Sequence, residues 1–342
     1  MKKQILKQIA AVNFVFLLAA FTAFVSAQTL NLQKEANING RLAFGANTGA
    51  GSQIYTVRPN GQDLRQITHA NGAALVPDWS SDGERIVFEH DQDTAEVCAN
   101  IAIMNGDGGN LVDLLQPNPN ICEGEPSFTP NGKRIVFERF DIDTGDDAIW
   151  SMKVNGSDRK RIIGPWPNGF ATDPNVSPDG QTLSFVGWDG SLVGPAPGFE
   201  LAKALFTVNI SGSSLSQLTP FTSDIAIKQD WAPDGRHIVL GTNANFFNPG
   251  ESANIATIRP NGTGLRYLTH YQGGNVNAFA GSYSPDGRYI VFRLEDHGSY
   301  ALFRMNTDGS DLHLILGFSN FRPRNIDWGR RSSGEKDEDD EN

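Results

Sequence analysis

The sequence of 342 residues contains only two cysteines, Cys98 and Cys122, and no Gly-x-Ser-x-Gly motif. Two cysteines allow one disulfide at most and exclude the dense disulfide framework of small secreted domains. Without that motif, the sequence gives no sign of an α/β-hydrolase nucleophile. The glycine clusters lie in hairpins rather than ahead of helices, so a phosphate-cradling loop is not expected.

Basic residues are also in deficit. The chain carries 28 Lys and Arg against 39 Asp and Glu, a formal net charge of −11. Lys2, Lys3 and Lys7 all belong to the first 27 residues, so removal of that segment would leave −14. A chain this acidic is a poor partner for nucleic acid or for an anionic membrane surface.

The two ends of the sequence differ from its middle. Residues 1–27 combine three lysines, an apolar stretch from Ala10 to Val25 and small residues around Ala27, which predicts a secretory signal peptide. We therefore expect a periplasmic or secreted protein with no stable membrane insertion after cleavage, although an uncleaved anchor is the alternative. Residues 335–342 hold six carboxylates against Lys336, and residues 331–342 are predicted to be a disordered, solubilising tail.

Between these ends the chain repeats. Turns of the Pro-Asp-Gly type recur five times, with glycines 48 to 55 residues apart, and a second set of Asn-Gly or Asp-Gly type turns recurs six times. Apolar, β-branched strands such as Ile86-Val87-Phe88 follow the first set. A period near fifty built from short strands and Gly-rich turns is typical of one four-stranded propeller blade per repeat. The second set has one turn more than the first, which indicates that one blade is shared between the two ends.

The sequence thus predicts an all-β fold, a six-bladed β-propeller of four-stranded antiparallel blades. Residues 41–44 match a second strand that has no inner strand before it, and residues 325–329 match an inner strand with nothing after it. Pairing of the N-terminal strands with this C-terminal strand would close the ring and leave no long exposed edge. The expected layout is a lead at 28–39 and one propeller domain at 40–330, and we expect a monomer.

Three segments carry a family resemblance: residues 54–61 (IYTVRPNG), Leu218-Thr219 and residues 231–235 (WAPDG). They resemble the repeats of TolB-type β-propellers, over about residues 40–329. The resemblance implies a six-bladed propeller exported to the bacterial periplasm, where TolB works through protein contacts in the Tol-Pal system. The sequence departs from TolB in one respect. TolB carries an α/β domain ahead of its propeller, whereas here only about a dozen residues separate the predicted signal from the first strand, so this domain is not expected.

Both sets of turns fall on one rim of such a ring, so the loops that connect one blade to the next share the opposite rim, called here the connecting rim. Loops presented by a rigid scaffold are common binding sites. We expect a protein or peptide partner in the cell envelope to contact this rim, and the predicted contacts are Asn71, Phe170, Asn275, Asn277 and Arg322. Ordinary solvated loop residues are the alternative at each position.

Two further predictions concern chemistry. Four carboxylates lie within residues 141–147, and Asp141, Asp143, Asp146 and Asp147 would suit a hard cation such as calcium, although the spacing is not that of an EF-hand. No other cofactor is expected. Export would place Cys98 and Cys122 in an oxidising compartment, near the same end of one blade, so a disulfide is predicted, with two free thiols as the alternative.

The sequence favours an exported, non-catalytic propeller that serves as a protein- or peptide-binding scaffold. The alternative is a propeller enzyme, a metal-dependent lyase or a lactone hydrolase, with a site at the channel mouth. That alternative requires His69, Asp173, Asp224 and His270 to converge there.

Overall fold

A computed structural model describes most of the repeat region. The described residues are 38–47, 51–70, 72–91, 98–167, 169–191, 202–223, 225–242 and 250–332. Residues 1–39 and 40–342 form separate units, and the second unit is the propeller. The predicted signal peptide and the acidic run from residue 333 lie outside the described residues, and within these no helix has the length and apolar character to span a membrane.

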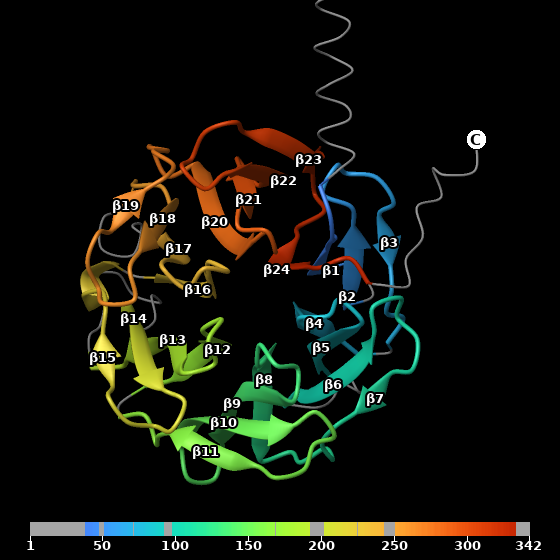
Figure 1. The fold of residues 1–342 in the computed structure, drawn as a ribbon, viewed down its shortest axis with the longest axis vertical. Coiled ribbons are helices and arrows are strands. Elements are labelled where there is room, and N and C mark those ends of the chain that lie inside the picture. The colour runs from blue at the N-terminus through green and yellow to red at the C-terminus, as the bar shows by residue number, and fades with distance from the viewer. Residues whose placement is uncertain are drawn as a thin grey trace, which may run out of the picture. The chain divides into compact units, whose positions relative to one another are not determined.

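The propeller consists of six four-stranded antiparallel sheets arranged around a centre (Figure 1). Blade 1 contains β24 (Arg324–Gly329), β1 (Arg41–Asn47), β2 (Ser52–Val57) and β3 (Arg65–Gln66). Blade 2 contains β4 (Ala74–Trp79), β5 (Arg85–His90), β6 (Asn100–Asn105) and β7 (Val112–Asp113). Blade 3 contains β8 (Ile121–Phe128), β9 (Arg134–Asp141), β10 (Asp146–Lys153) and β11 (Lys160–Ile163).

The other three blades follow the same order from the inner to the outer strand. Blade 4 contains β12 (Ala171–Val176), β13 (Thr182–Asp189), β14 (Ala202–Asn209) and β15 (Ser216–Gln217). A 3-10 turn at Phe221–Ser223 leads to blade 5, which contains β16 (Ile225–Trp231), β17 (Ile238–Thr242), β18 (Asn254–Ile258) and β19 (Arg266–Tyr267). Blade 6 contains β20 (Val276–Tyr283), β21 (Tyr289–Asp296), β22 (Ser299–Asn306) and β23 (His313–Ser319).

The predicted closure is confirmed by the pairing of the two ends of the propeller in blade 1. Strand β24 pairs antiparallel with β1, with Leu42 opposite Trp328 and Arg41 opposite Gly329. The inner strand of this blade thus comes from the C-terminal end and the other three come from the N-terminal end. The two ends of the repeat array are held together by sheet hydrogen bonds, so neither is a free sheet edge.

The turns after the inner strands show why Gly is needed at their last position. In blade 4 the Gly180 N–H donates to the Ser177 carbonyl at 2.8 Å, and Gly180 has a φ of 72°. The Ser177 hydroxyl donates to Asp179 at 2.6 Å, which fixes the turn from within. Only Gly adopts a positive φ without a steric cost, so the sequence pattern specifies the turn directly.

The hydrophobic core lies between the blades. One cluster combines Ala43 and Ile54 of blade 1 with Trp79, Phe88 and Met104 of blade 2. The phenylalanines of the second strands are fully buried in five of the six blades, at residues 44, 88, 137, 185 and 292. Apolar side chains on both faces of each sheet therefore fix neighbouring blades to each other.

Cys98 and Cys122 form a disulfide, with their Cα atoms 4.4 Å apart. The expectation that both cysteines lie in one blade is wrong. Cys98 precedes the third strand of blade 2, whereas Cys122 lies in β8, the inner strand of blade 3. Strand β8 begins at Ile121, one residue before Cys122, so the disulfide joins two blades.

Candidate functional site at the turn-side mouth of the channel

The inner strands are bulged in their middle. The register between β4 and β5 shifts between Leu75 and Asp78, and β8, β12, β16 and β20 shift at corresponding places. Residues with positive φ occupy the bulges at Val76, Glu125, Asp173, Lys228 and Asn325. A β-bulge re-aims the side chains beside it, and such features are frequent next to functional sites.

Carboxylates next to these bulges link three pairs of neighbouring blades. The backbone N–H groups of Phe128, Tyr283 and Trp79 donate to Asp78, Asp230 and Asp327, each at 2.8 Å and each across a blade boundary. In each case a single carboxylate oxygen, Oδ2, accepts the bond. The inner strands are thereby held at fixed positions around the channel by charge-assisted hydrogen bonds.

Blade 4 is linked to blade 5 by an aspartate at another position, Asp173, which occupies the bulge itself. The Asp173 carboxylate accepts from the Gln229 N–H at 2.8 Å, and the Gln229 side chain donates to the Asp173 carbonyl at 2.9 Å. The Ser127 hydroxyl donates to Asn175 at 3.3 Å, so neutral groups link blades 3 and 4 at this level.

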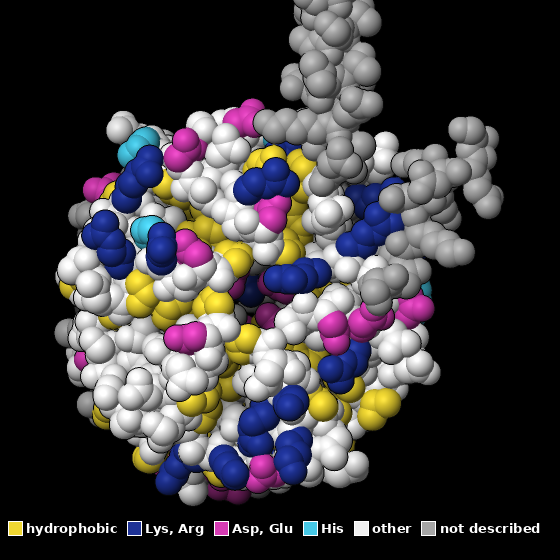
Figure 2. Space-filling view, in the orientation of Figure 1, with side chains coloured by type: hydrophobic (Ala, Val, Ile, Leu, Met, Phe, Trp, Pro, Cys, Tyr) yellow, Lys and Arg dark blue, Asp and Glu magenta, His cyan; other side chains and the backbone are white. Residues whose placement is uncertain are grey.

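The channel opens on the turn side into a cavity of about 220 Å³. Its polar lining includes Asp78, Asp230 and Asp327, and its apolar lining includes aromatic side chains from five blades: Trp79, Phe128, Trp231, Tyr283 and Trp328. Pro130, Pro178, Pro233 and Pro285 of the turns surround the opening. Figure 2 shows a central opening in the ring, with acidic and basic side chains inside it. We call this cavity the mouth.

One cation lies within this acidic environment. Lys228 is only 6% exposed. Burial disfavours its charge, but the carboxylates of Asp327, Asp173, Asp78 and Asp230 outweigh that effect and raise the pKa of Lys228. A single ammonium thus faces four carboxylates, and the channel keeps an excess of acidic groups.

Burial and neighbouring carboxylates raise the pKa values of acidic groups in the channel. Burial, followed by the neighbouring Asp327, raises the pKa of Asp78 well above its usual value. Burial also raises the pKa of Asp230 to about 7, even though Lys228 lowers it. For Glu125, burial together with Asp173 and Glu89 raises the pKa well above normal. One Glu125 oxygen, Oε2, is buried without a hydrogen-bond partner. Part of the channel charge is therefore neutralised by protons near neutral pH.

The predicted contact residues of the connecting rim differ in their surroundings. Asn71 lies outside the described residues. Phe170 packs against Phe140 and Trp188, with ring centroids 5.4 and 5.9 Å away. Asn275 is exposed and suited to a contact. Because no partner is present, their role as contacts stays a prediction.

The other two predicted contacts already have partners in the blades. The Asn277 side chain accepts from the Ala253 N–H at 2.8 Å and donates to the Gly274 carbonyl at 2.9 Å. Arg322 lies 3.6 Å from Glu295, and its guanidinium lies 5.0 Å from the centre of the Tyr300 ring. These bonds orient the connecting loops, whatever else the two residues contact.

The predicted calcium ligands do not act together. Among the described residues, no three His, Cys, Asp or Glu side chains are placed to hold a metal ion. Asp143 accepts from Asn120 at 2.8 Å, and the fully buried Asp147 accepts from the Ala171 N–H at 2.7 Å. Burial raises the pKa of Asp147 to about 6. Asp141 also accepts from the Thr144 N–H at 3.2 Å, so three of the four carboxylates make hydrogen bonds. The structure gives the calcium prediction no support.

The same finding bears on the enzyme alternative. Asp173 is buried and bonded to Gln229, whereas His69 is exposed and lies 3.1 Å from Gln66. His270 is also exposed, and Asp224 lies outside the described residues. Within the described residues, the side chains required by this alternative form no metal-binding group.

Sequence reasoning missed the acidic ring of the mouth. A signal was present, because Asp immediately precedes Trp in three blades, at residues 78, 230 and 327. Lys228 and Glu125 had no such signal, since other blades place different residue types at the bulge.

No family model matches the chain. A TolB homolog of Chlorobium luteolum is 26% identical over 145 residues, which cover 42% of this chain and 31% of that protein. The uncharacterized peptidase YuxL of Bacillus subtilis is 25% identical over 206 residues, which cover 49% of this chain and 29% of that protein. The chain thus spans less than a third of the length of these relatives.

Among solved structures, TolB from Acinetobacter baumannii superimposes with a TM-score of 0.68 at 19% identity, covering 86% of this chain and 68% of that chain. The chain has the fold of a TolB β-propeller. The expected resemblance is therefore confirmed for the fold. At this level of identity the fold is what the TolB-like propeller shares with its relatives, and its activity has to be argued from its own site.

Proposed function

We propose that this TolB-like propeller is an exported, non-catalytic scaffold that binds a protein or peptide partner in the bacterial cell envelope. The observation that carries the proposal is the mouth, where aromatic side chains and half-buried carboxylates line one cavity. Aromatic residues provide rigid contact area, and buried charges select the charge of a partner. The likeness to TolB proteins supports the role that the family resemblance implies.

The size of the mouth favours a macromolecular partner. Small-molecule sites usually occupy about 300–1,000 Å³, whereas the mouth encloses about 220 Å³. This volume suits one side chain or one chain end that projects from a larger partner. Because Asp78, Asp230 and Asp327 outnumber Lys228, we infer that the inserted group is basic, an amine or a guanidinium.

The proposal includes the compartment and the oligomeric state. A predicted signal peptide and TolB relatives support export to the periplasm, with secretion as the alternative. We propose that the exported protein acts as a monomer without insertion into the membrane, since blade 1 closes the ring. The residues of the connecting rim, Asn71, Phe170, Asn275, Asn277 and Arg322, are the alternative contact surface.

A capture experiment with two surface variants tests this proposal. The mouth variant carries Ser81→Lys, Pro178→Lys and Pro233→Lys, three changes at exposed turn positions that line the opening. The rim variant carries Asn71→Ala, Asn275→Ala, Asn277→Ala and Arg322→Ala. Each protein is crosslinked in envelope extract and its partners are identified, with matched thermal unfolding as the control for folding.

We expect the parent and the rim variant to recover the same protein and the mouth variant to lose it, because added cations repel a basic group. Loss in the rim variant alone would move the site to the connecting rim. Recovery of no protein by any of the three would contradict the binding role.

A further inference from the structure

A second cavity lies beside the mouth, in the cleft between blades 1 and 2. It encloses about 520 Å³ and is lined from blade 1 by Arg41, Thr56 and Arg65 and from blade 2 by Trp79 and Arg85, among others. Arg330 and Ser332, which follow β24, complete the lining. We call this cavity the arginine cleft. Its size falls within the range of ligand sites.

The arginine cleft has an excess of positive charge. Four arginines line it, against two acidic residues, Glu84 and Asp107. Arg65 is exposed over 58% of its side chain, so its guanidinium is accessible to a ligand. Arg85 lies 5.6 Å from the centre of the Phe128 ring, which holds its guanidinium at the boundary with blade 3.

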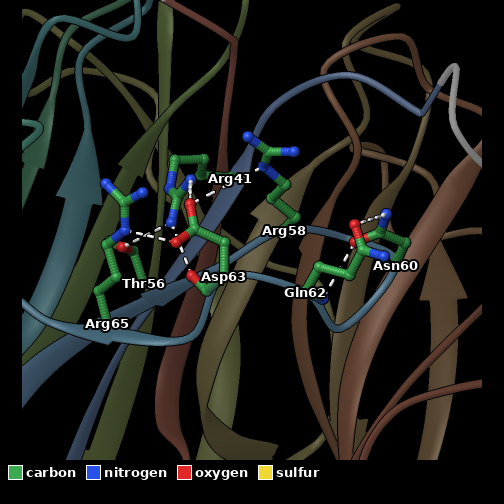
Figure 3. Close-up of polar contacts among 7 residues, drawn as sticks. All are labelled: Arg41, Thr56, Arg58, Asn60, Gln62, Asp63 and Arg65. Atoms are coloured by element: carbon green, nitrogen blue, oxygen red, sulfur yellow. Dashed lines mark hydrogen bonds and ion pairs between the residues drawn. The ribbon is translucent and has the colours of Figure 1, made fainter. Parts of the chain in front are cut away.

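Asp63 organises the blade 1 side of the cleft (Figure 3). Arg41 donates to the Asp63 carboxylate at 2.8 Å, to the Asp63 carbonyl at 2.9 Å and to Thr56 at 3.3 Å. Arg65 donates to the other Asp63 oxygen, and Arg58 lies 3.8 Å from this carboxylate. One carboxylate therefore contacts three guanidinium groups, so it orders them without neutralising them.

The corresponding cleft between blades 5 and 6 lacks this excess. It encloses about 640 Å³ and is lined by two arginines, Arg259 and Arg266, and two aspartates, Asp234 and Asp286. Equal numbers of opposite charges line it. The positive excess is thus a property of the cleft at blades 1 and 2 and not of every blade boundary.

The sequence supplies an acidic segment at the same place. Residues 335–341 contain six carboxylates and one lysine, and they begin three residues after Ser332, which itself lines the arginine cleft. Three extended residues span about 10 Å. A segment tethered this closely reaches an effective concentration in the millimolar range, which favours binding even when each contact is weak.

We propose that the arginine cleft binds the acidic C-terminal segment of the same chain, residues 335–341. Carboxylates of the segment pair with Arg65 and Arg330, which are exposed and line the cleft. The arginine cleft is distinct from the acidic mouth, so the two sites select ligands of opposite charge.

The test uses the full chain and a labelled peptide with the sequence of residues 333–342. In one variant the six tail carboxylates are neutralised (Glu335→Gln, Asp337→Asn, Glu338→Gln, Asp339→Asn, Asp340→Asn and Glu341→Gln). Fluorescence anisotropy measures peptide binding to the parent and to this neutral-tail variant. We expect the neutral-tail variant to bind at least tenfold more tightly, because its own tail no longer competes, and we expect 0.5 M salt to remove the binding.

Matched substitutions locate the peptide. In the neutral-tail background, Arg65→Gln with Arg330→Gln should weaken peptide binding at least tenfold. Arg259→Gln with Arg266→Gln removes the same charge from the balanced cleft and should leave peptide binding unchanged. If the first pair unfolds, Arg65→Gln alone serves, with a smaller loss of binding expected. Equal binding to the parent and the neutral-tail variant, or equal loss with both arginine pairs, would overturn the proposal. Neither result depends on a partner at the mouth.

Discussion

The Asp327 carboxylate accepts a hydrogen bond of 2.8 Å from the backbone N–H of Trp79, a residue that precedes it by 248 positions. This bond joins the last strand of the ring to the inner strand of blade 2, beside the sheet pairing that closes blade 1. In the same way, Asp78 accepts from the Phe128 N–H and Asp230 accepts from the Tyr283 N–H. One residue type thus both connects the blades and supplies negative charge to the mouth.

Replacement of this carboxylate tests its structural role. Asp327→Ala leaves the N–H of the buried Trp79 without a partner, and an unsatisfied buried donor costs about 1–3 kcal/mol. We expect the free energy of unfolding, measured by urea titration, to fall by that amount. Asp327→Asn retains an acceptor oxygen and removes a charge near Asp78, so its free energy of unfolding should fall much less. Equal losses in the two variants would contradict the hydrogen-bonding role.

The raised pKa of Asp230 predicts a pH dependence of stability. Its pKa is about 7 in the folded protein and about 3.9 in an unfolded chain. The folded state therefore holds a proton that the unfolded state releases, and stability should decrease as pH rises from about 4 to about 7, by at most about 1.4 kcal/mol per pH unit for this group.

Asp147, whose pKa is raised to about 6, acts in the same direction. Thermal unfolding between pH 4.5 and 7.5 measures the slope for the parent and for Asp230→Asn, which we expect to be flatter. Asp179→Asn is the control, because hydrogen bonds, first from Ser177, lower the pKa of Asp179 below this range. A parent whose stability rises across the range would contradict the assignment.

Removal of the channel cation should destabilise the ring. In Lys228→Met the carboxylates of Asp173, Asp230 and Asp327 lose the buried charge that offsets their repulsion. Loss of one partner from a buried ionic group costs about 3–5 kcal/mol. We expect this loss at pH 8 and a smaller one at pH 5, where protonated carboxyls need less compensation. Lys160→Met, which removes an ammonium 3.4 Å from Asp158 at the surface, should change stability by less than about 0.5 kcal/mol.

The disulfide between blades 2 and 3 should contribute to stability. It links residues 24 positions apart, and a loop of this length corresponds to about 3 kcal/mol in the chain-entropy model. We expect Cys98→Ala with Cys122→Ala to lower the free energy of unfolding by about that amount. Addition of a reducing agent should lower the stability of the parent similarly and leave the double variant unchanged. If the reducing agent also lowers the stability of the double variant, the disulfide is not the cause of the loss.

The sequence predicts the propeller well because each repeat contains the turn and strand residues that determine its blade. Gly180 and its counterparts need a positive φ, and continuous apolar runs such as Ile86–Phe88 need a sheet buried on both faces. The closing pair of β1 and β24 follows from the mismatch between the two sets of turns. These are local signals, repeated along the chain, and repetition removes the ambiguity of each.

The site is harder to predict because it forms where different blades meet. Lys228, Glu125 and Asp173 reach one channel from three blades, and each occupies a bulge that no local pattern marks. The disulfide was assigned to a single blade for a related reason, since Cys122 belongs to a strand whose start the sequence leaves undefined. The arginine cleft likewise depends on Arg41 and Arg330, which come together only when the ring closes.

Site-specific photo-crosslinking in whole cells shows whether a protein partner contacts the mouth or the connecting rim. A photoreactive amino acid replaces Ser81, an exposed residue at the mouth, or Asn275, an exposed residue at the connecting rim. The account predicts a light-dependent adduct of one protein with the probe at position 81 and none with the probe at position 275. An adduct only at position 275, or at neither position, would contradict it.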